Sequence, residues 1–513
     1  MKARQPRHRR NVQSSSVRTI VYGAGEAGAA VARLADRDPT ANVAVVGFID
    51  DDPAKTGKQL EGRPILGGLE TLASAVDHLG VEQLLVAMGA APPATIGSAF
   101  DAARALGLDV RTVPNLRRLE AGDLRPAMIQ PIQLDDLLPR RVAEPDAESL
   151  AAHVRGASVL ITGGAGSIGR ELGRQVLALQ PARLTIVDHH EEGIWATGRE
   201  LTDLRPSGRV ALDVRLADVR APQAVLAAFG AARPDVVFHA AALKHVPIVE
   251  DHPSEGALTN VGGTRNVLSA CEELDVARFV LISTDKAVNP TGAMGQTKRL
   301  AELLTLASAE RVGRPYVAVR FGNVLGSSGS VVPTFLSQLE RRAPITITDP
   351  EATRFFMTVS EAVGLILQAG AIATRGEVFV LDMGEPIRIT ELAGMLVRLA
   401  GFDPNDVPIR YTGLRPGERL HETLFFSDEI VDSTSHPGIF RVRASARDEQ
   451  SVATAERLAK RIEVAAEARD DEEVRLLLAL VSQPSEDGPA STSLDGGPAT
   501  RVDEDVARAS GGA

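Results

Sequence analysis

Asp285 and Lys286 place a carboxyl group next to an ammonium group, directly after Thr284 and the apolar run FVLIS. Such a pair can supply both an acid and a base to one substrate. Met294 follows eight residues after Lys286, and Lys298 comes four residues later, on the same face of the expected helix. We therefore expect Thr284, Asp285, Lys286, Met294 and Lys298 to form a catalytic group.

A glycine turn that precedes this group has the pattern of a phosphate-binding loop. The segment from Thr162 to Gly169 reads TGGAGSIG and follows the apolar run ASVLI. Without a Cβ, its backbone can approach a pyrophosphate, and the helix N-terminus beyond it favours negative charge. Asp188 ends the next expected strand, where its carboxylate can accept from both ribose hydroxyls and would repel a 2′-phosphate. The pattern therefore predicts NAD rather than NADP. The predicted cofactor-binding residues are Thr162, Gly163, Gly166, Ser167, Ile168, Gly169, Asp188, Asp218, Val219, Ala240, Ala241, Ala242, Asn260 and Lys298.

A second glycine turn lies near the N-terminus. The segment from Gly23 to Gly28 reads GAGEAG, which fits G-x-G-x-x-G after the apolar run VRTIVY, and Asp50 ends the following run. No catalytic group follows this turn. A dinucleotide, another nucleotide and no ligand at all remain open for this part of the chain.

Strands that alternate with helices must position both turns. The pattern predicts an α/β protein with two tandem Rossmann-like, doubly wound parallel sheets, the second carrying a small substrate-binding lid at 338–425. The predicted parts are a disordered basic leader (1–16), an N-terminal Rossmann-like, CoA-binding-like domain (17–125), a connector without a sheet of its own (126–151), an NAD-binding domain with its lid (152–440), terminal helices (451–482) and a disordered acidic tail (483–513).

Composition excludes several classes of protein. The chain has 513 residues, with 56 Lys and Arg against 67 Asp and Glu, so its formal charge of −11 argues against a nucleic-acid partner. The single cysteine, Cys271, excludes an internal disulfide and fits a cytoplasmic protein. No H-E-x-x-H, CxxC, G-x-S-x-G or P-loop pattern occurs, so no metal site is predicted. No apolar run approaches the roughly 18 residues of a membrane span.

Several motifs resemble those of a known family. The segments TGGAGSIG, HAAALKHVP, TNVGGT, STDKA, RFGNVLGSSGSVVP, TDPEATRFFM and RPGERLHE are similar to those of extended short-chain dehydrogenases/reductases. More narrowly, the chain resembles the CapD-like polysaccharide biosynthesis proteins, the UDP-N-acetylglucosamine 4,6-dehydratases, over about residues 17–440. Large members usually begin with transmembrane helices. This chain is either a soluble member without them or one from which the membrane part was removed. We expect a cytoplasmic homo-oligomer, as is common in the superfamily, with membrane association left open.

The resemblance implies a lyase reaction with tightly bound, recycled NAD. Carbon 4 of UDP-N-acetylglucosamine is oxidised, the proton on carbon 5 is removed, the carbon 6 hydroxyl leaves as water, and carbon 6 is reduced. By resemblance, Asp285 is the acid and Lys286 the base. Met294 stands where the family's tyrosine would be, which goes with retained configuration at carbon 5. We expect Thr284 to orient the carbon 4 hydroxyl and Asp285 to take its proton, directly or through a water. By resemblance, Lys244 and Glu250 face the sugar or stabilise its pocket, and Asn323 contacts the diphosphate. Arg354 and Arg415 are candidates for the UDP phosphates, and Glu418 for the uridine ribose or the lid.

Two alternatives remain. A UDP-sugar 4-epimerase of the same superfamily would need the missing tyrosine and has no use for an adjacent acid and base. A catalytically silent nucleotide-sugar-binding regulatory protein would need neither Asp285 nor Lys286. For the N-terminal domain we expect a structural or regulatory role without redox chemistry.

Overall fold

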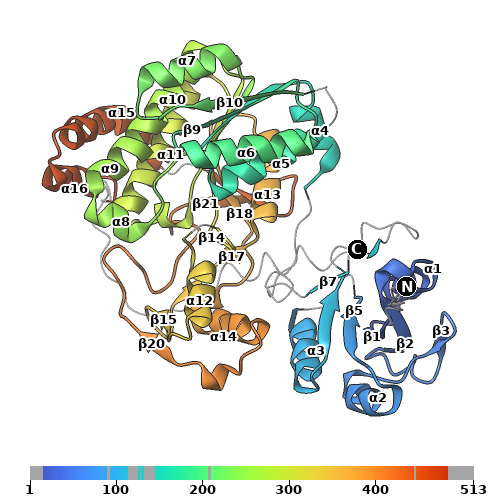
Figure 1. Cartoon of the computed structure of the whole chain (residues 1–513). Helices are drawn as coiled ribbons and strands as arrows, with labels where there is room; N and C mark the ends of the chain where they lie inside the picture. The colour runs from blue at the N-terminus through green and yellow to red at the C-terminus, as the bar shows by residue number, and fades with distance from the viewer. Residues whose placement is uncertain are drawn as a thin grey trace, which may run out of the picture. The chain divides into compact units, whose positions relative to one another are not determined.

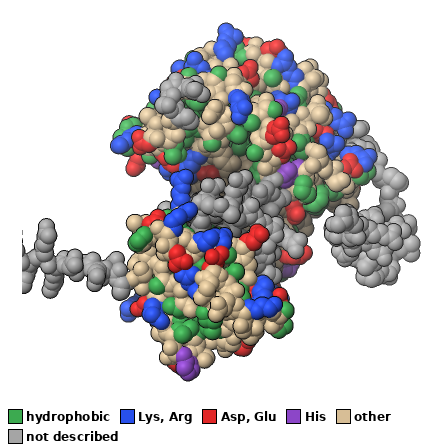
Figure 2. Space-filling view, turned by 90° about the vertical axis from the view of Figure 1, so that its right-hand side faces the viewer, with side chains coloured by type: hydrophobic (Ala, Val, Ile, Leu, Met, Phe, Trp, Pro, Cys, Tyr) green, Lys and Arg blue, Asp and Glu red, His purple; other side chains and the backbone are tan. Residues whose placement is uncertain are grey.

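The computed structural model describes residues 16–88, 93–113, 125–126, 129–131, 145–205, 210–327, 329–443 and 446–482. The predicted leader, apart from residue 16, and the predicted tail lie outside the described residues, as does much of the predicted connector. Within the described residues, no helix is long and apolar enough to cross a membrane. On the face shown in Figure 2, Lys and Arg side chains are interspersed with Asp and Glu side chains.

The first sheet has the order β2-β1-β5-β6-β7. Its first four strands are parallel because each is a short apolar run followed by a helical crossover, whereas β7 pairs antiparallel with β6. This strand falls within the segment predicted to have no sheet of its own. The elements of this region are β1 (Val17–Tyr22), α1 (Glu26–Arg37), η1 (Pro39–Ala41), β2 (Val43–Ile49), β3 (Gln59–Leu60), β4 (Arg63–Pro64), η2 (Leu69–Thr71), α2 (Leu72–Leu79), β5 (Gln83–Val86), α3 (Pro93–Ala105), β6 (Asp109–Thr112) and β7 (Gln130–Pro131).

The second sheet has nine strands in the order β10-β9-β8-β11-β12-β13-β18-β22-β21. The first seven are parallel, and β22 and β21 close the edge as antiparallel strands. The two tandem Rossmann-like sheets predicted from the sequence are thus confirmed (Figure 1). The strands are β8 (Ser158–Thr162), β9 (Arg183–Asp188), β10 (Ala211–Leu216), β11 (Val236–His239), β12 (Arg278–Ile282), β13 (Tyr316–Arg320), β18 (Glu377–Leu381), β21 (Ile430–Ser433) and β22 (Ile439–Arg443).

Helices cover both faces of this sheet because its strands are apolar on both sides. One core contains Ile161 and Ile186 and packs under α4 (Ala147–Val154), α5 (Ser167–Ala178), α6 (Glu191–Leu204) and α13 (Val359–Ile372). The other contains Leu160 and Val187 and packs under α7 (Pro222–Ala232), α10 (Gly263–Glu273), α11 (Ala293–Val312), α15 (Ala446–Glu467) and α16 (Asp471–Ala479). The two helices predicted at the C-terminal end therefore complete this core.

A third core belongs to a smaller group of elements (Figure 1). It is formed by α12 (Val331–Glu340), α14 (Ile389–Leu399) and β15 (Ile345–Ile347), which pairs with the exposed strand β20 (Ile409–Tyr411). The predicted lid at 338–425 was drawn too wide, because α13 and β18 within it belong to the main sheet. The remaining elements are α8 (Val246–Asp251), α9 (Pro253–Gly256), η6 (Ala257–Gly262), η7 (Asp285–Ala287), β14 (Asn323–Val324), β16 (Thr353–Arg354), β17 (Phe356–Met357), β19 (Ile387–Arg388) and η8 (Pro404–Asp406).

Candidate active site

The glycine turn after β8 lies where the strand order reverses. From β8 the chain moves outward to β9 and β10 and then returns to β11 on the other side of β8. Ligands bind in open α/β sheets at such a reversal. Gly163 has φ +68°, and a Cβ there would lie 2.4 Å from the amide nitrogen of Ala241. Only glycine therefore allows the turn to meet the Ala240–Ala242 loop, so the two predicted cofactor segments are adjacent.

The turn and the helix that follows it have a shape that fits a dinucleotide. Gly169 also has to be glycine, because its Cβ would lie 2.1 Å from the carbonyl oxygen of Gly163. Gly166 caps α5 without a side chain, so Ser167 and Ile168 present the first turn of the helix at an open end. A pyrophosphate fits this end because the N–H groups at the start of a helix and the helix dipole both favour negative charge.

Asp188 and Asp218, the acidic residues predicted to bind the cofactor, form contacts with other residues of the protein. Asp188 accepts hydrogen bonds from the amides of Ala165 and His190, both at 2.9 Å. Its carboxylate thus supports the turn. Asp218 forms an ion pair with Arg220 at 2.7 Å, and the side chain of Val219 is buried in the core.

A buried series of hydrogen-bonded polar side chains connects this turn to helix α11. Thr162 contacts His239 Nδ1 at 2.6 Å, and His239 Nε2 contacts Thr264 at 3.1 Å. Asn260, in the π-helical segment η6, holds both backbone groups of Leu243 and donates to Thr297 at 3.0 Å. Burial and the charge of Lys298 lower the pKa of His239 to about 3, so this imidazole is neutral. The polar chain thus fixes the loop after Ala242 relative to α11.

The predicted acid–base pair lies at the carboxyl end of β12. Asp285 is fully buried, and its Oδ1 accepts from Lys286 Nζ at 2.9 Å and from Thr284 Oγ1 at 2.8 Å. Lys286 Nζ also donates to Asn323 Oδ1 at 3.1 Å. Asn323, predicted to contact the diphosphate, therefore lies against the lysine. The backbone brings these four residues together because β12 and β13 are neighbouring parallel strands.

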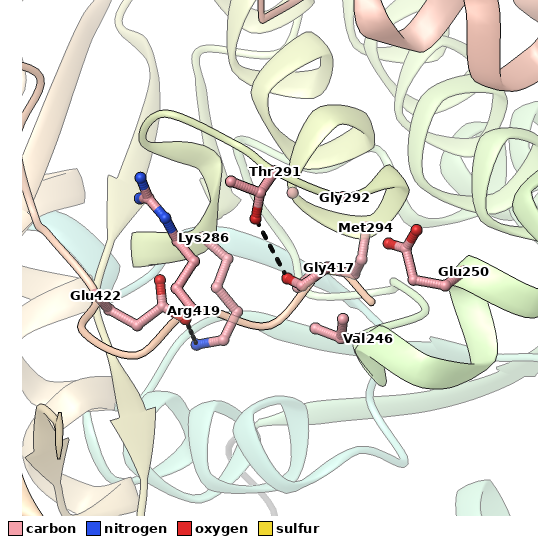
Figure 3. A pocket seen from close by; sticks show the side chains of 10 residues that line it. Val246, Glu250, Lys286, Thr291, Gly292, Met294, Gly417, Arg419 and Glu422 are labelled. Atoms are coloured by element: carbon pink, nitrogen blue, oxygen red, sulfur yellow. Dashed lines mark hydrogen bonds and ion pairs between the residues drawn. The ribbon is translucent and has the colours of Figure 1, made fainter. Parts of the chain in front are cut away.

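Helix α11 places Met294 and Lys298 beside that pair. Met294 is buried in the first turn and lines a pocket with Lys286 (Figure 3). Lys298 Nζ donates to the carbonyl of Ile282 at 2.7 Å, just before the Thr284–Lys286 segment. Burial lowers the pKa of Lys298 to about 8. This ammonium group is thus held at the strand end by one carbonyl.

Glu250 and Lys244 come from the segment between β11 and α9. Burial raises the pKa of the Glu250 carboxyl, although the backbone amides of Met294 and Ala293, in the first turn of α11, oppose this shift. It also lines the pocket in Figure 3, where it lies beside Met294. Lys244 is exposed on the loop that Asn260 fixes.

The charged residues predicted to bind the substrate phosphates come from the segments around 354 and 415–422. Arg354 donates to the carbonyls of Thr353, Leu420 and Arg419. Its guanidinium therefore holds the backbone of the second segment. Arg415 is exposed, and its amide donates to Glu418 at 3.2 Å.

The two charged pocket residues that the sequence analysis did not select both lie in the RPGERLHE motif. Arg419 and Glu422 line the pocket together with Lys286 (Figure 3). Glu422 Oε1 lies 3.9 Å from Lys286 Nζ and 3.9 Å from Arg354 Nε. The RPGERLHE motif contains both Glu418 and Glu422, but the sequence analysis selected only Glu418 as a substrate-binding residue.

A second buried cluster of charges holds the strand ends behind the pocket. Glu302 accepts from Arg320 at 2.8 and 2.9 Å, from Arg299 at 3.0 Å and from Ser283 at 2.6 Å. Arg320 is fully buried and also pairs with Glu429 at 2.7 Å. The cluster thus joins β12, β13, α11 and the segment before β21.

Comparison with known proteins identifies the relatives of this chain. Residues 159–444 match the family described as polysaccharide biosynthesis protein, and residues 1–114 match a CoA-binding domain. The probable polysaccharide biosynthesis protein EpsC of Bacillus subtilis is 37% identical over 84% of this chain and 72% of its own length. The capsular polysaccharide biosynthesis protein CapD of Staphylococcus aureus is 37% identical over 82% of this chain and 71% of its own length.

Shorter matches extend to other members of the superfamily. UDP-glucose 4-epimerase of Rickettsia akari is 40% identical over 42% of this chain and 62% of its own length. The X-ray structure of Pen from Bacillus thuringiensis has a TM-score of 0.52 and is 33% identical, covering 57% of this chain and 90% of that one. The resemblance inferred from the motifs is confirmed: the chain belongs to the polysaccharide biosynthesis protein family.

Proposed function

We propose that this chain is an NAD-dependent lyase that converts UDP-N-acetylglucosamine into a UDP-4-keto-6-deoxy sugar, with retained configuration at carbon 5. The observation that carries the proposal is the ion pair of the buried Asp285 with the partly exposed Lys286 at the end of β12, beside a helix that presents Met294. A dehydration needs an acid and a base at one sugar. The match to capsular polysaccharide biosynthesis proteins supports a nucleotide-sugar substrate.

The side chains divide the work at the sugar. Thr284 and Asp285 share a hydrogen bond at 2.8 Å, so together they can orient the carbon 4 hydroxyl and accept its proton. Lys286 takes the proton from carbon 5 when its amine is neutral. Met294 adds no proton acceptor and only shapes the pocket. NAD, when bound at the Thr162–Gly169 turn, supplies the oxidation of carbon 4 and the reduction at carbon 6.

A 4-epimerase is the competing enzyme function, and the partial match to UDP-glucose 4-epimerases favours it. Epimerisation needs a proton acceptor at the position of Met294 and no base at carbon 5. Methionine cannot accept that proton. In an epimerase, moreover, the Asp285–Lys286 pair would have no role in the reaction. The residues therefore favour dehydration.

Product analysis distinguishes the two functions. The purified protein is incubated with UDP-N-acetylglucosamine, and the nucleotide sugars are separated and identified by proton NMR. A 4-keto-6-deoxy product with an unchanged configuration at carbon 5 supports the proposal. An epimer at carbon 4 with both hydroxyls retained would replace it by the epimerase function.

The N-terminal domain is proposed to serve a structural or regulatory role. Asp50 Oδ2 accepts from the amide of Ala24 at 2.7 Å and pairs with Lys55 at 2.8 Å. A ribose at this carboxylate would compete with Lys55. The match to a CoA-binding domain suggests a nucleotide-containing ligand without a redox task.

A further inference from the structure

Helix α16, near the C-terminal end of the described chain, makes polar contacts with the pocket walls that the roles assigned above do not use. Its residues Asp471 and Arg475 are four residues apart, and Ser482 follows seven residues later, so these spacings return to one side of the helix. The apolar residues of α16 are buried in the core that also contains residues of α11. The core therefore holds α16 in place, and its polar side chains can act on neighbouring backbone.

Two of these side chains hold the segment that brings Glu250 to the pocket. Arg475 Nη2 donates to the backbone carbonyl of Glu250 at 2.8 Å. The Asp471 carboxylate accepts from the amide of Ser254 at 3.3 Å and from the hydroxyl of the same residue. The side chain of Glu250 lies beside Met294 in the pocket (Figure 3). This pocket wall is thus hydrogen-bonded to α16 at both ends of residues 250–254.

The third side chain holds the turn that leads into α11. Ser482 Oγ donates to the carbonyl of Pro290 at 3.0 Å and accepts from Gln296 Nε2 at 3.1 Å. The residues between these two contacts include Thr291, which lines the pocket and contacts the carbonyl of Gly417 at 3.5 Å (Figure 3). The turn is therefore bonded to the end of α16 as well as to the RPGERLHE segment.

The two walls that α16 holds meet without spare room. An added Cβ at Gly292 would lie 2.3 Å from Glu250 Oε1, so a shift of either wall changes the space beside Met294. A misplacement of about 1 Å in an active site can lower a rate about 100-fold. We propose that Arg475 and Ser482 are positioning residues that fix the two walls of the substrate pocket. This role rests on the pocket of the proposed function and on no single step of its chemistry.

The test combines kinetics with hydrogen exchange of the backbone. In Arg475→Met/Ser482→Ala, both walls lose their contacts with α16. With UDP-N-acetylglucosamine, we expect kcat/KM to fall at least about tenfold, mainly through a higher KM, while the content of bound NAD stays at the wild-type level. Amide exchange followed by mass spectrometry should become faster in residues 246–254 and 288–296 but not in the glycine turn at 162–169.

Two further double and single variants serve as rescue and control. Arg475→Lys/Ser482→Thr keeps a donor at each position, so it should recover most of the affinity and of the exchange protection. Arg461 forms an exposed ion pair with Glu473 at 3.7 Å within the same pair of helices. Arg461→Met should therefore leave kinetics and exchange unchanged. If Arg475→Met/Ser482→Ala does not fold, each single variant is measured instead and should lower kcat/KM about threefold.

Two results would overturn the assignment. Kinetics and exchange within about twofold of wild type would show that the walls hold their positions without α16. Equally faster exchange in residues 162–169 and 288–296, together with loss of NAD, would make α16 a helix that only stabilises the whole domain. A wild type that releases no dehydrated sugar would refute the proposed function, whereas the exchange pattern of the variants would still decide the positioning role.

Discussion

Replacing Glu302 by glutamine should destabilise the domain built on the second sheet. The change removes one negative charge from a fully buried cluster in which Arg320 and Arg299 donate to that carboxylate. Burial disfavours the ionised form, but the charge and hydrogen bonds of Arg320 outweigh it and hold the pKa of Glu302 at about 2, against an ordinary value of 4.5. At about 1.4 kcal/mol for each pKa unit, this difference corresponds to about 3 kcal/mol of folding free energy. Removing one partner of a buried ion pair typically costs about 3–5 kcal/mol.

Urea unfolding followed by tryptophan fluorescence measures this loss of folding free energy in the domain that contains Glu302. Trp195 is the only tryptophan of the chain and lies on α6, with the guanidinium of Arg199 5.1 Å from its ring centre. Its emission therefore reports on the second domain. Glu302→Gln should lower the free energy of unfolding by about 3 kcal/mol. Glu351 forms an exposed ion pair with Arg388, so the control Glu351→Gln should change this free energy by at most about 1 kcal/mol.

The pH dependence gives the same prediction a second test. A carboxyl whose pKa is lowered by folding stabilises the protein above its unfolded pKa, and this contribution is lost as the pH falls toward the folded pKa. The difference between wild type and Glu302→Gln should therefore be complete above about pH 4.5 and shrink as the pH approaches 2. A difference below about 1 kcal/mol at neutral pH, or one that grows on acidification, would refute the reasoning.

Three further substitutions test the site and the first domain. Met294→Tyr should change the turnover rate or the configuration at carbon 5 by adding a proton acceptor at the carbon 4 hydroxyl; an unchanged rate and product would remove any special role for Met294. Gly163→Ala should abolish copurification of NAD, because its Cβ would lie 2.4 Å from the amide nitrogen of Ala241, and NAD content at the wild-type level would contradict the predicted cofactor turn. Gly25→Asp should leave turnover unchanged, because an added Cβ there meets no atom within 4 Å among the described residues, whereas loss of turnover with the second domain still folded would give the first domain an active part.

Local patterns allowed the strand ends to be predicted, because apolar runs followed by glycine or polar residues are continuous in sequence. The Thr284–Lys286 segment and the turn at Gly163 lie at carboxyl ends of strands for this reason. Partners that come together only through the fold could not be predicted in the same way. Asn323 was assigned to a diphosphate, but its amide oxygen accepts from Lys286.

Charged residues were the least predictable, because charge in a sequence does not show what neutralises it. Arg354 was assigned to a phosphate, and its hydrogen bonds to three backbone carbonyls are visible only in the folded chain. Glu422 was passed over, since only the folded chain brings it within 3.9 Å of Lys286. The extent of the lid was missed because β18 is an apolar run like any other and reaches the main sheet through non-local pairing with β13.

The most direct measurement of the central claim is mass spectrometry of the purified protein incubated with UDP-N-acetylglucosamine in deuterated water, with no cofactor added. The proposed dehydratase should release a sugar that has lost one water and gained one solvent deuterium at carbon 5, which would also show that NAD is carried by the protein. An unchanged sugar, with NAD added and with other UDP-sugars tried, would contradict the proposal and favour a regulatory nucleotide-sugar-binding protein.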